Sequence, residues 1–246
     1  MAQHGKRFRV VINDKHFSAH TREFNVTRPI DTADASSFAS EYKEVIVGLA
    51  DGGLSINGYF NGEVDGIDEE LSAAIGNASP AIVMGGPAGF KTVGGVVFCA
   101  LALESTYDIT GSIGDVVGVS ANFQSDEKGV RSGINLHAGE TNGDPGDESA
   151  SGTSTTVDSA APSTGGYAAY LSVISNTRDA GATVKIEHSA NGSSWADLTT
   201  FTTVAAGNTT SERKTATGTV NRYLRGSWTL SAGTGTLAFA LVLARL

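Results

Sequence analysis

Cysteine, proline and methionine are scarce in this chain, which has one Cys, five Pro and two Met among 246 residues. With Cys99 as the single cysteine, no intrachain disulfide can form, and its apolar neighbours predict a buried, unreactive thiol. The longest apolar runs, residues 93–103 and 237–243, are too short to span a membrane, and the N-terminus has no apolar signal region. These absences predict a soluble protein made in a reducing cytoplasm, without a membrane partner.

Charge is sparse as well, with 17% charged residues and a net charge of −9. A protein that grips nucleic acid through its phosphates presents a basic surface, so this balance argues against tight DNA binding. It suits a surface that DNA slides past without sticking, although ordinary solubility is the simpler explanation of the charge.

Catalytic and metal-binding patterns are also missing. The loop at residues 85–92 resembles a phosphate-binding loop, but Phe90 separates the glycine from Lys91 and Pro87 removes a backbone amide. No nucleophile elbow and no calcium-loop spacing occur. The histidines, too, lack a metal-ligand spacing; they are His4, His16, His20, His137 and His188. The sequence therefore predicts a non-enzymatic protein without a metal or cofactor.

What the chain does have is many short runs of β-forming residues separated by Gly, Asn, Asp and Ser, which predict a mostly β fold. Strands are expected at residues 7–12, 15–19, 22–28, 94–103 and 116–123, with Asn13-Asp14 as a turn. One short helix is expected at residues 68–75, with Asp65 or Asp68 as its N-cap.

Residues 25–60 form the most informative stretch. A strand ends at Pro29, and a polar excursion of residues 31–44 follows, which carries Phe38 and Tyr42. Alternating apolar residues then predict a β-hairpin over residues 45–60, with its turn at Asp51-Gly52-Gly53. A long excursion of this kind is usually functional.

Two charged clusters stand out in the first half. The first is a basic N-terminal edge, and the second is an acidic patch beside the expected helix. Solvated strand edges explain the basic cluster and helix capping explains the acidic one, and together the two clusters can also form a contact between neighbouring copies. The edge consists of Lys6, Arg7 and Arg9, and the patch of Glu63, Asp65, Asp68, Glu69 and Glu70.

The second half begins after a Gly/Ser/Thr-rich stretch. Residues 1–140 are interpreted as one β domain, residues 141–166 as a linker, and residues 167–246 as a smaller antiparallel β-sandwich. Alternatively, part of the linker, around residues 153–158, is an edge strand. The turn that ends at Trp195 resembles a turn of galactose-binding-like jelly rolls, which makes Trp195 a possible glycan platform. Trp195 and Trp228 are otherwise explained as core residues.

Residues 8–60, taken in order, resemble the tail tube (major tail) proteins of long-tailed bacteriophages. The later order, with a short helix and two apolar strands, extends the likeness to about residue 125. The segments that carry it are Val10-Val11-Ile12-Asn13-Asp14, Val26-Thr27-Arg28, Asp31-Thr32, Phe38, Val47-Gly48-Leu49-Ala50-Asp51-Gly52-Gly53 and Leu54-Ser55-Ile56-Asn57-Gly58-Tyr59-Phe60.

The resemblance implies a β-sandwich or barrel-like fold with a flanking helix, whose copies assemble into six-fold rings that stack into a hollow, DNA-carrying tube in the virion tail. It also implies that the excursion contacts neighbouring subunits, through candidates Asp31, Thr32, Phe38, Tyr42 and Glu44. The expected partners are copies of the chain, other phage tail proteins, DNA that passes without specific binding, and a cell-surface glycan. The alternatives are a carbohydrate-binding adhesin and a trimeric capsid decoration protein.

Overall fold

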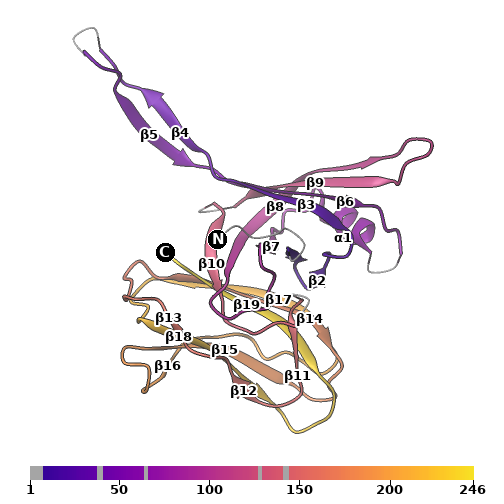
Figure 1. The fold of residues 1–246 in the computed structure, drawn as a ribbon, viewed down its shortest axis with the longest axis vertical. Coiled ribbons are helices and arrows are strands. Elements are labelled where there is room, and N and C mark those ends of the chain that lie inside the picture. The colour runs from indigo at the N-terminus through magenta and orange to yellow at the C-terminus, as the bar shows by residue number, and fades with distance from the viewer. Residues whose placement is uncertain (1–7, 38–40, 64–65, 127–128, 141–143) are drawn as a thin grey trace. The chain divides into compact units, whose positions relative to one another are not determined.

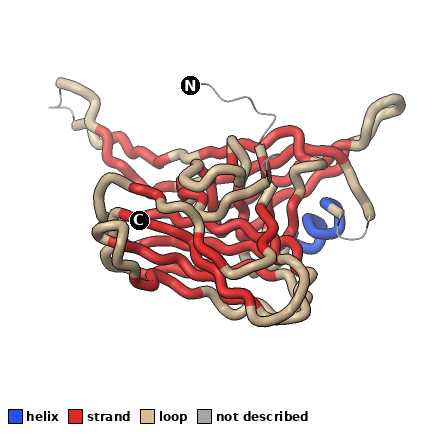
Figure 2. Tube along the Cα trace, turned by 60° about the horizontal axis from the view of Figure 1, so that its bottom comes forward, coloured by secondary structure: helices blue, strands red, loops and turns tan. Residues whose placement is uncertain are grey.

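The computed structural model describes residues 8–37, 41–63, 66–126, 129–140 and 144–246. The expected fold class is confirmed, because the described residues form antiparallel strands and one short helix (Figures 1 and 2). None of the helices in these ranges is long and apolar enough to cross a membrane.

The chain divides into two compact units, and neither is continuous in sequence. Unit 1 comprises Met1–Ala19, Ile82–Cys99 and Arg131–Leu246, and unit 2 comprises His20–Ala81 and Ala100–Val130. The long strand β8 (Val96–Thr110) contributes residues to both units. The boundaries therefore differ from the division at residue 140 that composition suggested.

Unit 1 contains a β-sandwich, as expected for the C-terminal part of the chain. In one sheet, β19 (Leu237–Arg245) pairs with β14 (Tyr167–Asn176), β10 (Arg131–Asn135) and β11 (Gly146–Glu148), and β14 also pairs with β17 (Thr210–Ala216). In the other sheet, β18 (Tyr223–Leu230) lies beside β15 (Ala182–Ser189), which pairs with β16 (Ala196–Thr200).

The core of unit 1 lies between these two sheets. Leu171, Phe239 and Leu241 from one sheet meet Ile186 and Trp228 from the other, and all are buried. Strand β19 is buried over almost its whole length, so both of its faces are covered. Apolar burial of this extent is the main favourable term that holds a sandwich together.

Residues 146–158, which the sequence analysis placed in a linker, contain short strands. Strand β11 pairs with β19, whereas β12 (Gly152–Thr153) and β13 (Val157–Asp158) pair with β18. These residues therefore belong to the sandwich, in line with the edge-strand alternative. Composition did not predict these strands, because short edge strands bury few side chains and can consist of small polar residues.

The N-terminal strands of unit 1 agree with their prediction. Strand β1 (Arg9–Ile12) pairs with β2 (Lys15–His16) and with β7 (Ala81–Gly86). Asn13 adopts the left-handed conformation at φ 52°, as the predicted turn requires.

Unit 2 is built on antiparallel strands that follow the order β3, β6, β9, β8. Strand β6 (Gly53–Tyr59) pairs with β3 (Thr21–Thr27) and with β9 (Gly118–Ser125), and β9 pairs with β8. Leu54, Ile56 and Phe123 are buried, together with Leu71 of the helix α1 (Ile67–Ala74). The helix is confirmed, but its N-cap is Gly66 without a side-chain cap, so the prediction of Asp68 as the cap was wrong. Asp65 lies outside the described residues.

The predicted hairpin over residues 45–60 was wrong. Strand β5 (Val45–Ala50) pairs with β4 (Ile30–Asp34), and β6 pairs with β3, so the chain forms one long hairpin in two parts. Asp51-Gly52 lies between β5 and β6, opposite Arg28-Pro29, where the pairing of the two long strands is interrupted. The chain continues in the same direction here and does not turn. The excursion accordingly begins as a strand.

Candidate assembly surface

The outer part of this long hairpin, residues 30–50, forms an arm that projects from the sheet of unit 2 (Figure 1). Its two strands make a separate two-stranded sheet. Thr32 lies opposite Val47, and Ala33 lies opposite Ile46. A lone pair of strands has little stability of its own in water, so the arm depends on something packing against it.

The arm exposes apolar side chains on both of its faces. Val47 is 69% exposed on one face and Ile46 is 61% exposed on the other, while Tyr42 near the tip is 83% exposed. Soluble domains rarely leave such groups together in water, and a cluster of them marks an interaction site. Because both faces are apolar, covering one of them would still leave the other unburied.

The base of the arm is anchored by hydrogen bonds. The Asp51 N–H donates to the Pro29 carbonyl at 3.0 Å, and the Ser125 N–H donates to the Gly52 carbonyl at 2.8 Å. The Gln124 side-chain amide donates to the Asp51 carboxylate and to the Gly52 carbonyl. A Cβ on Gly52 would come within 2.9 Å of the Val130 nitrogen, so the close approach here requires glycine. The arm thus leaves the sheet from a fixed point.

The contact residues predicted from the sequence fall on this arm. Asp31 and Thr32 lie in β4, and Tyr42 and Glu44 lie in the connection to β5; all four are exposed. Phe38 lies outside the described residues. The sequence prediction missed the apolar residues of β5, which it assigned to a hairpin with β6.

The acidic patch lies around α1. Glu63 and Glu69 are exposed, whereas Asp68 is half-buried and its carboxylate accepts a hydrogen bond from the Tyr107 hydroxyl at 2.6 Å. Glu70 is half-buried as well. These acids share one region of unit 2, which leaves the patch available as a charged surface.

The basic N-terminal edge is described only in part, because Lys6 and Arg7 lie outside the described residues. The Arg9 guanidinium donates to Asp144 at 2.5 Å, and His16 lies 3.4 Å from the same carboxylate. The one described guanidinium of the edge is therefore paired within its own unit.

Trp195 and Trp228 have different environments. Trp228 is 6% exposed and its indole N–H donates to the Ala150 carbonyl, so the core interpretation is correct for this residue. Trp195 is half-buried, and the guanidinium of Arg225 lies 4.2 Å from the centre of its ring. Arg225 in turn donates to Glu187 at 2.6 Å. One tryptophan is structural, and the other is a partly covered surface ring.

Glu104 is a residue that the sequence analysis missed. Its side chain is 7% exposed, and neither carboxylate oxygen has a hydrogen-bond partner. Burial without a partner raises the pKa of Glu104 to about 8. The signal was present in the sequence, because Ala100, Ala102 and Glu104 alternate onto the same face of β8.

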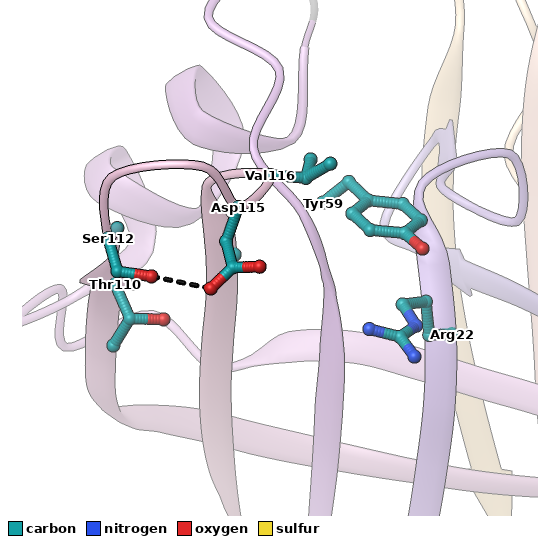
Figure 3. Close-up of a pocket in the computed structure, with 8 residues that line it drawn as sticks. Arg22, Tyr59, Thr110, Ser112, Asp115 and Val116 are labelled. Carbon is teal, nitrogen blue, oxygen red and sulfur yellow. Dashed lines mark hydrogen bonds between the residues drawn. The ribbon is translucent and has the colours of Figure 1, made fainter.

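An open pocket of about 510 Å³ lies at the end of the unit 2 sheet, where β3 begins and β6 ends. Figure 3 shows Arg22 and Tyr59 on one side of it and Thr110, Ser112 and Asp115 on the other. The Arg22 guanidinium lies 5.2 Å from the Tyr59 ring centre, and the Ser112 hydroxyl donates to Asp115 at 2.6 Å.

Comparisons with known proteins found matches only among solved structures. No family model and no curated protein sequence matches the chain. One match is a chain in the structure of the virion of a native gene transfer agent particle. The alignment covers 51% of this chain and 95% of the matched chain, at 16% identity and a TM-score of 0.43. The phage SPP1 Dit protein, described as a hub of the adsorption apparatus in phages that infect Gram-positive bacteria, matches 95% of this chain and 98% of its own, at 11% identity and a TM-score of 0.36.

A third match is the baseplate of the anti-feeding prophage, which covers 54% of this chain and 95% of its own, at 11% identity and a TM-score of 0.39. These neighbours are proteins of tail, hub and baseplate particles. All three TM-scores lie below 0.5, and no family assignment follows from them.

Proposed function

We propose that the chain is a structural subunit of a phage-type tail, which assembles with copies of itself into hexameric rings that stack into a hollow tube for DNA delivery. The arm carries this proposal. It exposes Val45, Ile46 and Val47 at 50–69% while its base is firmly held in unit 2. The ordered sequence likeness of residues 8–60 to tail tube proteins supplies the particular assembly, and the role requires no catalytic residue.

Burial energetics favours a contact at the arm. Full burial of a Val or Ile side chain is worth about 1.5–3 kcal/mol. Val45, Ile46 and Val47 are 50–69% exposed, so each can contribute about half to two thirds of that amount against the entropy lost on association. A closed ring would in addition cover sheet edges that a single copy leaves open. Both effects favour assembly over a monomer.

The charge of the chain suits a channel for DNA. With a net charge of −9, a tube wall built from this chain would repel phosphates and let DNA pass without sticking. The patch of Glu63, Asp68, Glu69 and Glu70 is our candidate for the inner wall or for the contact between rings. Cryo-electron microscopy of an assembled tube tests this, and a lumen lined by Lys and Arg would contradict it.

Negative-stain electron microscopy and mass measurement of the purified chain test the assembly itself. We expect rings or tubes that grow with concentration, with a hexameric mass for the smallest closed species. Persistent monomers at high concentration would overturn the proposal, and a discrete trimer would favour a capsid decoration protein.

A point substitution tests the arm. Ile46→Asn should raise the concentration needed for assembly by about tenfold or more, because it removes one buried apolar contact per interface. Val96→Asn is the matched control, since Val96 is also an exposed strand residue, at 51%, but belongs to unit 1 and lies outside the arm, the acidic patch and the pocket. Equal assembly of the two variants would contradict a role for the arm.

Trp195 supports a second candidate function, glycan binding. Its partly exposed ring lies beside the Arg225 guanidinium, which donates to Glu187, and an aromatic ring next to charged groups can hold a sugar. A glycan array with Trp195→Ala as the comparison tests it. Binding by the unmodified chain that the variant loses would support this candidate, and no binding by either would remove it.

A further inference from the structure

The arm and the Arg22–Tyr59 pocket lie at opposite ends of the same strands. Strand β3 starts at Thr21 beside the pocket and ends at Thr27 beside the arm, while β6 runs the other way. Seven residues of strand separate the two ends by about 20 Å. Because the arm points away from the sheet (Figure 1), it cannot reach the pocket of its own copy.

The pocket is lined by one cation, one carboxylate, and both polar and apolar side chains. At a register shift between Thr21 and Glu23, the bulged Arg22 is aimed into the pocket. Among the residues that the structure describes, Arg22 forms no ion pair. Asp115, which also lines the pocket, accepts a hydrogen bond from the Ser112 hydroxyl and keeps its negative charge, so the pocket holds one cation and one carboxylate. Apolar groups rim the pocket: Tyr59 is 38% exposed and Val116 is 70% exposed.

The arm has complementary chemistry. Between residues 30 and 50 it carries four carboxylates, Asp31, Asp34, Glu41 and Glu44, against the single ammonium of Lys43. Lys43 lies 3.7 Å from Asp34, so the other three acids contribute most of the negative charge. The arm also exposes Val47 and Tyr42. The exposed Val47 and Tyr42 thus match the apolar rim of the pocket, and Arg22 can pair with one carboxylate of the arm, on the side of the pocket away from Asp115.

We propose that the arm of one copy docks in the Arg22–Tyr59 pocket of the next copy, so that copies join head to tail. This inference rests on the proposed function, and it names the receiving surface. A contact between two different patches of the same chain generates a closed ring when the rotation closes, and an open chain when it does not.

Cross-linking tests the contact directly. Val47→Cys combined with Val116→Cys should give a ladder of disulfide-linked species under mild oxidation, up to the full ring. Cys99 is buried and does not interfere. Each single variant should give no ladder, and Val47→Cys with Ser193→Cys is the matched control, because Ser193 is exposed in unit 1.

Mixing of two defective variants tests the head-to-tail geometry. One variant keeps the pocket but has residues 30–50 replaced by Asn-Gly. The Asp51–Pro29 hydrogen bond already joins the two ends, so a two-residue turn can connect them. The other is Arg22→Glu, which keeps the arm. Neither should assemble alone, and together they should form a 1:1 dimer, while Arg22→Lys should assemble within about threefold of the unmodified concentration.

The outcomes separate the two proposals. The docking site would be overturned, and the tail function left standing, by either of two results. One is that Arg22→Glu forms rings or tubes at the same concentration as the unmodified chain. The other is that the double-cysteine variant forms tubes without a disulfide-linked ladder. A ladder of open chains without rings or tubes would support the docking site and overturn the tail function. An unmodified chain that never associates would overturn both.

Discussion

The carboxyl group of Glu104 is buried in unit 2 without a hydrogen-bond partner, which costs free energy whenever it is ionised. Burial likewise raises the pKa of the Tyr107 hydroxyl, which donates to Asp68, and the charges of Asp68 and Glu104 raise it further. Protonation of Glu104 removes the cost, and the raised pKa of about 8 follows. A single residue thereby couples the stability of unit 2 to pH.

We expect the chain to lose stability as pH rises from 4.5 to about 8. Over this window the unfolded chain releases the Glu104 proton while the folded chain keeps it, so the free energy of unfolding falls by up to about 1.4 kcal/mol per pH unit. Glu104→Gln should remove most of this slope and stabilise the protein at pH 7.5.

Urea unfolding at pH 5.5 and 7.5 measures the effect. Glu63→Gln is the control, since Glu63 is exposed and its substitution should leave the slope unchanged. The same pH slope in Glu104→Gln as in the unmodified chain would contradict the assignment.

His137 is another buried polar residue, and it lies in unit 1, where its ring contacts β19 and β11. One ring nitrogen lies 2.9 Å from the Phe239 carbonyl and the other 3.0 Å from the Glu148 carboxylate, and the ring stacks on Phe239 at 3.8 Å. His137→Ala should lower the free energy of unfolding by about 3 kcal/mol, because it leaves a cavity and removes two side-chain hydrogen bonds.

Chemical denaturation of His137→Ala and Glu148→Gln checks this. The second variant keeps an oxygen acceptor beside the ring and should cost less. A loss below about 1 kcal/mol in His137→Ala would show that the contacts contribute little.

At the scale of elements, the arm and the sandwich strands should differ in local stability. Amides of β4 and β5 should exchange with solvent quickly in the monomer, because these strands pair only with each other. In the assembled protein their exchange should slow by about tenfold or more, whereas amides of β14 and β19 should be protected in both states. Mass spectrometry of exchanged peptides measures this, and equal arm protection in both states would argue that the arm remains uncovered.

The sequence predicted most elements but not all of their partners. Local signals located α1, the Asn13 turn and the strands expected at residues 22–28 and 116–123, since period and turn chemistry are encoded within a few residues. They failed at Asp51-Gly52-Gly53, which has the composition of a turn. Its actual role depends on Pro29, more than 20 residues earlier in the chain, and no local pattern encodes that pairing.

The candidate site was predicted only in part, for a related reason. The polar excursion drew attention to residues 31–44, but Val45 and Val47 were assigned to a hairpin with residues 54–60, because alternation cannot reveal which strand is the pairing partner. The pocket was not foreseen, since Arg22 and Asp115 meet only in the folded unit.

At the scale of the whole molecule, unit 1 draws on three separate segments of the chain. A fragment of residues 167–246 lacks β10 and β11, which pair with β19, and β12 and β13, which pair with β18. We expect this fragment to unfold without a cooperative transition, whereas residues 131–246 should retain more structure. Thermal melts followed by circular dichroism compare the two, and a sharp transition in the shorter fragment would contradict this.

The position of β19 also sets an order of events during synthesis. It is the last described strand to be made, yet it lies between β14 and β10 in the sheet and supplies much of the core. Until residues 237–245 have emerged from the ribosome, the sandwich lacks the strand that lies between β14 and β10, and its core cannot be completed. Every strand of unit 2 has been synthesised by then. The exposed apolar arm of unit 2 can therefore form before the sandwich of unit 1 is complete. Chaperone binding would matter most during that interval.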